Sequence, residues 1–118
     1  MITFMMKRHD TRPFLDTNLR VSPTEYVDLN IADIKVTFIM KDIDTNEVKI
    51  NAKSCIIIDP DTGSVRYPWV PEDTNTTGIY QGEFEVSFPS EGGLANAKVT
   101  YPVDDSFVVV IMEDFNNA

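Results

Sequence analysis

Tyr80-Gln-Gly-Glu-Phe-Glu-Val-Ser-Phe88 is the stretch of sequence that decides the fold. Every second residue, from Tyr80 to Phe88, is apolar or glycine, and the residues between them are polar or charged. A period of two places all the apolar side chains on one face of a β-strand. The stretch therefore predicts a strand with one buried face.

The same period recurs on both sides of this stretch, from Ala32 to Met112. Asp42-Ile-Asp-Thr-Asn46 and Asp59-Pro-Asp-Thr-Gly63 separate apolar runs with turn-forming residues. No segment there keeps a helical period, so we expect seven or eight short strands in a sandwich or barrel. The expected core is Ile34, Val36, Phe38, Val65, Tyr80, Phe84, Val86, Val108 and Val110, and a further expected inward row is Val48, Ile50 and Ala52.

Two late segments differ in the position we expect for them in a sheet. Phe107–Met112 is continuously apolar, which is typical of a central strand. Asn96–Tyr101 carries Lys98 and Thr100 and is the better candidate for an exposed edge. Because an uncovered edge can pair with another chain, we expect Lys98 and Thr100 at a protein contact.

The first nineteen residues are expected to form an extended arm outside a sandwich of residues 20–118. The arm combines apolar with basic side chains, and prolines interrupt the segment that follows. We expect it to contact another protein rather than its own core, although Pro13–Leu19 could instead form a first edge strand. The candidate contact residues are Phe4, Met5, Met6, Lys7, Arg8 and Arg12.

Charge and composition narrow the function. The net charge is −9, and residues 21–118 hold seventeen acidic against six basic side chains. Such a body repels a phosphate backbone, so we expect no nucleic-acid binding. The longest apolar run has six residues, whereas a membrane helix needs about 20. Basic residues follow the apolar N-terminus rather than precede it, so we expect neither a signal peptide nor a membrane span.

Residues for catalysis or metal binding are scarce. His9 is the only histidine and Cys55 the only cysteine, which leaves no triad, disulfide or zinc site. The aspartate-rich turns begin like calcium loops but lack the required glycine and the final glutamate. Glu83 and Glu85 belong to the outward side of their strand. We therefore expect no enzyme activity and no cofactor or metal.

The chain from Ala32 to Met112 resembles the immunoglobulin-like domain at the N-terminus of phage baseplate upper proteins. The matching residues are Ala32-Asp-Ile-Lys-Val-Thr-Phe-Ile-Met40, Asp59-Pro-Asp-Thr-Gly-Ser-Val-Arg-Tyr-Pro-Trp69, Asp73-Thr-Asn-Thr-Thr-Gly-Ile-Tyr-Gln-Gly-Glu-Phe-Glu-Val86, Tyr101-Pro102 and the closing apolar strand, with Asp10-Thr-Arg-Pro13 as lead-in. This resemblance implies an all-β, immunoglobulin-like antiparallel β-sandwich of seven to eight strands.

Three residues have expected structural roles in such a sandwich. Tyr80 precedes Gly82 by two positions, and Gly82 stands where antibody domains have their second cysteine. Tyr80 therefore suits a tyrosine corner, in which the phenol bonds back to the preceding loop. Trp69 offers a large apolar body for the space that a disulfide would fill.

The resemblance implies a non-catalytic virion protein, made in the host bacterial cytoplasm, that docks on other virion proteins in many copies. A baseplate, a tail and a capsid surface all remain open as its place. The alternative is a sandwich that binds carbohydrate or a host surface. It would need exposed rings, and the candidates are Trp69, Tyr67, Tyr26 and Tyr101.

Overall fold

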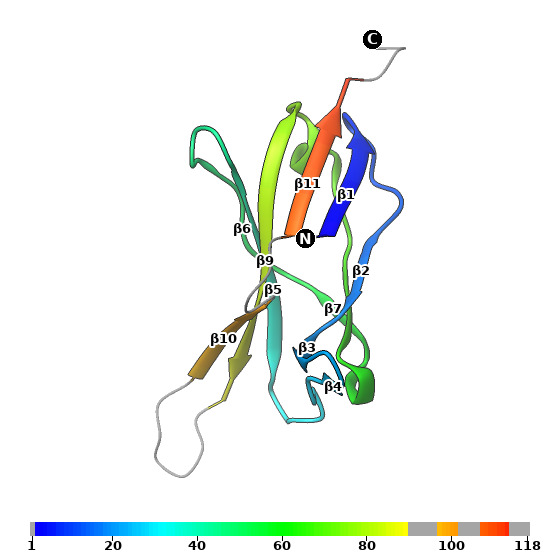
Figure 1. The fold of residues 1–118 in the computed structure, drawn as a ribbon, viewed down its shortest axis with the longest axis vertical. Coiled ribbons are helices and arrows are strands. Elements are labelled where there is room, and N and C mark those ends of the chain that lie inside the picture. Colours follow the sequence, from blue (N-terminus) through cyan, green and yellow to red (C-terminus); the bar gives the residue numbers. More distant parts are fainter. Residues whose placement is uncertain (1, 90–96, 102–106, 114–118) are drawn as a thin grey trace.

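The computed structural model describes residues 2–89, 97–101 and 107–113, and these form two facing β-sheets and a small hairpin (Figure 1). The six-stranded sheet has the order β1 (Ile2–Lys7), β11 (Phe107–Met112), β9 (Gly78–Phe88), β5 (Lys35–Asp42) and β6 (Val48–Ser54), with β10 (Ala97–Tyr101) also pairing with β9. The three-stranded sheet has the order β2 (Leu15–Asn18), β8 (Ser64–Tyr67) and β7 (Ile56–Asp59), and the hairpin consists of β3 (Arg20–Ser22) and β4 (Glu25–Tyr26).

The expected all-β class is confirmed. Helical structure in the described part of the chain is confined to two 3-10 turns, η1 (Pro60–Thr62) and η2 (Pro71–Thr74). None of the described helices is long and apolar enough to cross a membrane. All strand pairs are antiparallel except β1 with β11, which run parallel, so the six-stranded sheet is mixed.

One hydrophobic core lies between the two sheets. Leu15, Val65 and Tyr67 reach it from the three-stranded sheet, and Phe38 and Phe84 reach it from the six-stranded sheet. The rings of Phe38 and Tyr67 meet across the interface, with centroids 4.9 Å apart. Aromatic pairs at this spacing add to the free energy of burial, so these rings help to hold the sheets together.

The predicted alternation of buried and exposed residues is confirmed in β9. In β11 the prediction of which residues face the core is wrong. Tyr80, Gly82, Phe84 and Val86 are buried as expected. In β11 the buried residues are Phe107, Val109 and Ile111, while Val108 and Val110 are only partly buried. A strand that is apolar on both sides contains no pattern from which its inner face can be read. Ile34, also expected in the core, is partly buried and lies against it.

The predicted position of Phe107–Met112 is confirmed, because β11 lies between β1 and β9. Strand β10 occupies the same side of β9 as β11 but pairs with its second half, from Phe84 to Phe88. Among the described strands β10 has no neighbour other than β9, which is the edge position expected for Lys98 and Thr100.

The expected N-terminal arm is wrong. Ile2–Lys7 pairs with the whole length of β11, and Met6 is buried in the core. Leu15 and Leu19 are buried too, and β2 forms the first edge strand that the sequence offered as an alternative. The sequence contains little sign of this strand, because Phe4 and Met6 alternate with Thr3, Met5 and Lys7 over only a few residues. Met5 is itself apolar, which weakens the alternation further.

Further contacts hold the segment after β1 against η2. The backbone N–H of His9 donates to the carbonyl oxygen of Thr74 at 3.0 Å. The Thr74 hydroxyl donates to the carbonyl oxygen of Asp10 at 2.9 Å, and Thr74 itself is fully buried. Strands β1 and β2 are therefore paired with the rest of the β-structure, and the expected boundary between residues 19 and 20 does not separate an arm from a body.

The two aspartate-rich turns form as the sequence predicts. Asp42 caps the turn after β5, because its carboxylate accepts the backbone N–H groups of Asp44 and Thr45. Asp59 likewise accepts the N–H of Asp61, and Gly63 then takes a left-handed φ of 63°. A Cβ on Gly63 would lie 2.6 Å from the Leu19 carbonyl oxygen, so both the turn and the neighbouring chain require glycine there.

Gly82 has a different reason to lack a side chain. A Cβ built on it would lie 2.8 Å from Cζ of Phe38, whose side chain is fully buried. The Phe38 ring is enclosed by the rings of Tyr67, Trp69 and Phe84, with centroids 4.9 to 5.9 Å away. It therefore has no room to move aside.

We expect Gly82→Ala to lower the free energy of unfolding by about 1–3 kcal/mol, the usual effect of overpacking a core. The measurement is urea denaturation followed by fluorescence. Phe38→Leu also destabilises alone, but it removes the ring that the new methyl group would strike. The double variant should therefore lose less than the two single losses combined. Strict additivity would contradict the contact.

Candidate functional site

The described residues that were expected at a protein contact lie in several different settings. Phe4 is partly buried, with its ring 6.0 Å from that of Trp69, and Met6 belongs to the core. Arg8 forms an ion pair with Glu113 at 2.8 Å, and Lys7 is partly buried. Met5 alone of these apolar side chains is strongly exposed, at 57%. The structure thus splits the expected contact group between core and surface.

Arg12 is held by an aromatic ring. Its guanidinium lies over the Phe14 ring, 4.2 Å from the centroid, and Arg66 lies against the same ring at 4.8 Å. Arg66 also donates two hydrogen bonds to the Asp16 carboxylate, at 2.8 and 2.9 Å, and these bonds lower the pKa of Asp16. The basic residues of the N-terminal segment therefore make contacts within the chain.

The three residues with expected structural roles, Trp69, Tyr80 and Gly82, are all buried. The Tyr80 phenol donates to the carbonyl oxygen of Thr76 at 2.8 Å, the bond expected of a tyrosine corner. Trp69 is buried and meets Phe38 and Tyr67 edge to face. The ring nearest to Gly82, however, belongs to Phe38 and not to Trp69. Trp69 contacts Phe38 and contributes none of the atoms nearest to Gly82.

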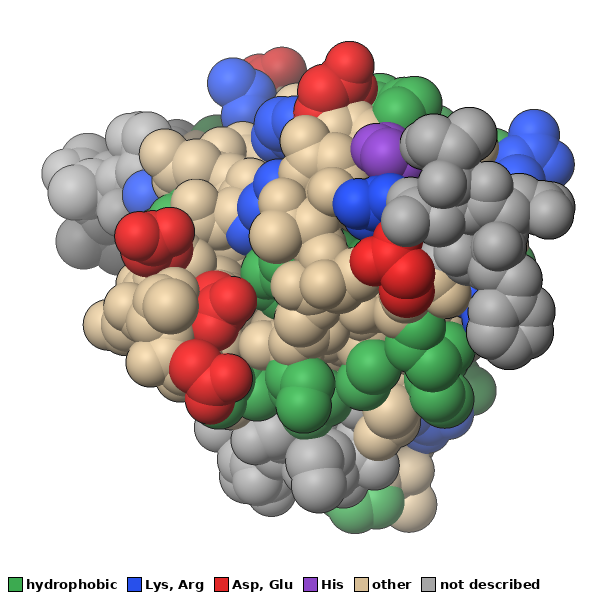
Figure 2. Space-filling view, turned by 90° about the horizontal axis from the view of Figure 1, so that it is seen from above, with side chains coloured by type: hydrophobic (Ala, Val, Ile, Leu, Met, Phe, Trp, Pro, Cys, Tyr) green, Lys and Arg blue, Asp and Glu red, His purple; other side chains and the backbone are tan. Residues whose placement is uncertain are grey.

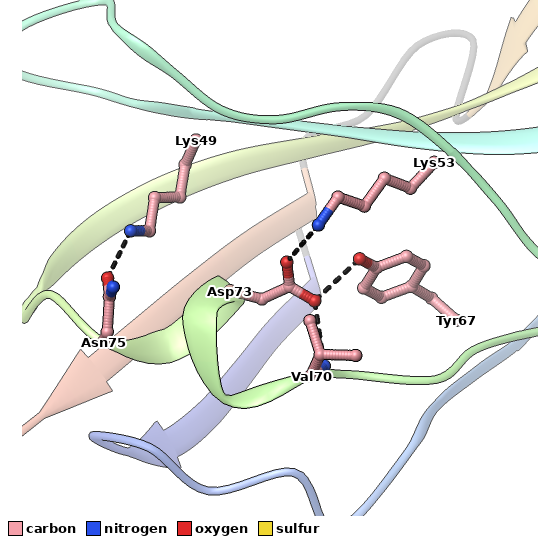
Figure 3. A network of polar contacts seen from close by, with 6 residues as sticks. All are labelled: Lys49, Lys53, Tyr67, Val70, Asp73 and Asn75. Atoms are coloured by element: carbon pink, nitrogen blue, oxygen red, sulfur yellow. Dashed lines mark hydrogen bonds and ion pairs between the residues drawn. The ribbon is translucent and has the colours of Figure 1, made fainter.

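The most extensive polar cluster of the described chain surrounds Asp73 in η2 (Figure 3). Asp73 is 2% exposed, and its Oδ2 accepts the Tyr67 phenol at 2.7 Å and the Val70 backbone N–H at 3.0 Å. Its Oδ1 receives Lys53 Nζ at 3.1 Å. A buried carboxylate is tolerated only when it is paired and hydrogen-bonded in this way. Lys49 extends the cluster with a hydrogen bond to Asn75.

A β-bulge turns Lys53 toward this cluster. Between the pairs Phe38–Lys53 and Met40–Ile50, β6 contains one more residue than β5. Ala52 lies in this bulge and has a left-handed φ of 51°. A second register shift separates the pairs Met40–Ile50 and Lys41–Val48. Together the two irregularities break the expected alternation of Val48, Ile50 and Ala52, of which only Ile50 is buried. The bulge at Ala52 brings Lys53 to the side of β6 that faces Asp73.

The sequence does not predict this cluster, because its members lie in three separate segments of the chain. The signal available was Pro71-Glu-Asp-Thr74, in which a proline starts a short helical turn and an aspartate two residues later can bond back to the N–H before it. Nothing in the spacing of Tyr67, Lys53 and Asp73 indicates that they meet. The Val70 bond caps η2 itself, whereas the Tyr67 and Lys53 contacts hold η2 against β8 and β6, so we interpret the cluster as a structural clamp.

The groups considered for other chemistry lie elsewhere. Burial raises the pKa of the Cys55 thiol to about 12, which keeps it protonated and a poor nucleophile at neutral pH. His9 is exposed, and Glu83 and Glu85 point outward from β9. In the described ranges no three His, Cys, Asp or Glu side chains converge as metal ligands. Of the rings proposed for sugar binding, Trp69, Tyr67 and Tyr101 are buried, and Tyr26 lies under Arg20.

No protein-family model matches this chain, and no curated protein matches it either.

We expect Ala52→Gly to raise the free energy of unfolding by about 0.5–1 kcal/mol. The left-handed conformation costs alanine about 1–2 kcal/mol and glycine almost nothing, whereas glycine adds some entropy to the unfolded chain. Ala52 is exposed, so no packing is lost. Chemical denaturation measures the change.

The matched control is Ala32→Gly. Ala32 is also exposed, but its φ is not positive, so glycine there should leave stability unchanged or lower it slightly. If both substitutions destabilise the protein equally, the strained bulge at Ala52 does not exist in solution.

Stability should also fall as the pH rises above about 9. Burial raises the pKa values of Tyr67, Tyr80, Tyr101 and Cys55 above their ordinary values of 10.0 for tyrosine and 9.0 for cysteine. The folded protein keeps these protons while the unfolded chain releases them. The free energy of unfolding therefore falls as the pH rises above about 9. The urea midpoint should therefore be lower at pH 11 than at pH 8. Tyr67→Phe should reduce the slope, and a midpoint that rises over this range would contradict the assignment.

Proposed function

We propose that this chain is an immunoglobulin-like sandwich that serves as a non-catalytic docking module of a phage virion, at a baseplate, tail or capsid surface. The observation that carries the proposal is the order of the strands. The sheet β2-β8-β7 follows the order of strands B, E and D of an immunoglobulin domain, and β11-β9-β5 follows G, F and C. Strand β6 then takes the place of the additional strand that variable-type domains carry beside C.

The tyrosine corner adds support from side-chain chemistry. In immunoglobulin domains this tyrosine stands near the start of strand F, two residues before the second cysteine. Tyr80 is the third residue of β9, and Gly82 follows two positions later. The first strand departs from the constant-type pattern, because β1 lies beside the last strand and not beside β2. The resemblance to phage domains of this fold then supplies the virion role by analogy.

Docking of such a module would use its sheet edges. Strand β10 lies at an edge and presents exposed Lys98 and partly buried Thr100 on the outer side, opposite Ser87 and Glu85 of β9. A neighbouring strand could continue the sheet there through backbone hydrogen bonds. The carbohydrate-binding alternative has less support, because three of its four candidate rings are buried in the core.

We expect particles assembled with and without this protein to differ by a repeated density at one virion location in electron microscopy. Lys98→Glu combined with Thr100→Glu should reduce incorporation into particles, because it places negative charge on the docking edge. Lys35→Glu, at an exposed position of β5, is the control with the same change of sign and should be incorporated normally. Absence of the protein from purified particles would refute the virion role, and unchanged incorporation of the double variant would refute the edge.

A further inference from the structure

The outer side of the six-stranded sheet, which faces away from the core, has an apolar end. Met5, Val110, Ile79 and Ile43 form a row across four neighbouring chain segments, since Met5 pairs with Val110, Val110 with Ile79, and the Ile43 N–H donates to the Ile79 carbonyl oxygen. Met5, Ile79 and Ile43 are 57%, 48% and 47% exposed. Val108 and Met112 flank the row on the same side of β11. These six residues are called the outer apolar face.

Figure 2 looks onto this end of the molecule from above and shows hydrophobic side chains gathered along the lower part of that view. Scattered exposed apolar residues are normal on a protein surface, but a contiguous group spanning several strands marks an interaction surface. The row is contiguous because strand pairing places each member beside the next.

We propose that the outer apolar face is a self-association surface, and that its occupant is the same face of a second copy of this chain. This inference names a contact surface of the docking module proposed above, and it relies on that proposal only for its use in a virion. Purified protein can show the self-association whether or not the virion role holds.

The charges around the face favour a second copy over a partner of one sign. A surface that recognises a strongly acidic or basic partner carries one sign of charge around its apolar centre. Here Lys41 and Glu83 lie at the rim on the adjacent strands β5 and β9, on the outward side. Neither belongs to an ion pair between described residues. In a two-fold contact, Lys41 of one copy can face Glu83 of the other copy, and the symmetry repeats this pairing on the opposite side.

The size of the face fits a weak dimer. The face lies on β1, β11 and β9 and on Ile43, which directly follows β5. Strands about 4.8 Å apart and outward residues about 6.7 Å apart give roughly 20 Å by 20 Å, or about 400 Å² of sheet. Two copies would bury on the order of 800 Å², which is below the roughly 1,200 Å² of stable specific interfaces and in the range of weak, transient contacts. Such contacts are reversible alone and become strong when repeated in an assembly.

The test is sedimentation equilibrium of the purified full chain at low and high salt. We expect a monomer–dimer equilibrium at roughly 0.01–1 mM, as is typical of small interfaces. Each copy carries −9, so salt should strengthen the association by screening the repulsion. An association driven by attraction between the lysines of one copy and the acidic surface of another would instead become weaker as the salt concentration rises. A monomer throughout, or an association that weakens with salt, would overturn the proposal.

Ile79→Lys places a charge in the centre of the face and should weaken dimerisation by at least about tenfold. Ile56→Lys is the matched control, because Ile56 is an isoleucine 52% exposed in β7 of the other sheet and the change in net charge is identical. Ile56→Lys should dimerise like the original chain. If Ile79→Lys does not fold, as judged by circular dichroism, Met5→Lys in β1 makes the same test. If Ile56→Lys weakens dimerisation as much as Ile79→Lys does, the proposal is also overturned.

Discussion

The packing of the Phe38 ring against Gly82 is the contact on which the rest of the β-structure depends. A glycine in the centre of a long strand leaves room for a ring from the neighbouring strand, and that ring reaches across to Tyr67 of the opposite sheet. Trp69 and Phe84 enclose it. Antibody domains join their two sheets with a buried disulfide beside a tryptophan. This chain has one cysteine and uses close-packed aromatic rings instead.

Around that centre, polar groups determine where the irregular segments lie. The buried carboxylate of Asp73 holds η2 to β8 through Tyr67 and to β6 through Lys53. The β6 bulge makes the second of these contacts possible, at the cost of a left-handed alanine. Because Asp73 is buried, loss of one of its partners would leave its carboxylate incompletely compensated and would destabilise this arrangement of the segments.

The N-terminal strand changes how the surface of the protein should be understood. By pairing with β11, Ile2–Lys7 buries Met6 and covers what would otherwise be the exposed edge of a strongly apolar strand. The same pairing presents Met5 on the opposite side, beside Val110. The segment that looked like a free docking arm thus protects one edge of the sheet and enlarges its outer apolar face.

The sequence by itself determined the all-β class, the inward face of Tyr80–Phe88, the two aspartate-led turns, and the central position of Phe107–Met112. Each of these is set by neighbours along the chain, through side-chain alternation and turn chemistry. Only the tertiary structure decided the partner of β1, the inner face of β11, the side on which Lys53 lies and the meeting of Tyr67 with Asp73. These depend on contacts between segments far apart in sequence, and an evenly apolar strand or a single bulge leaves no periodic signal from which they could be read.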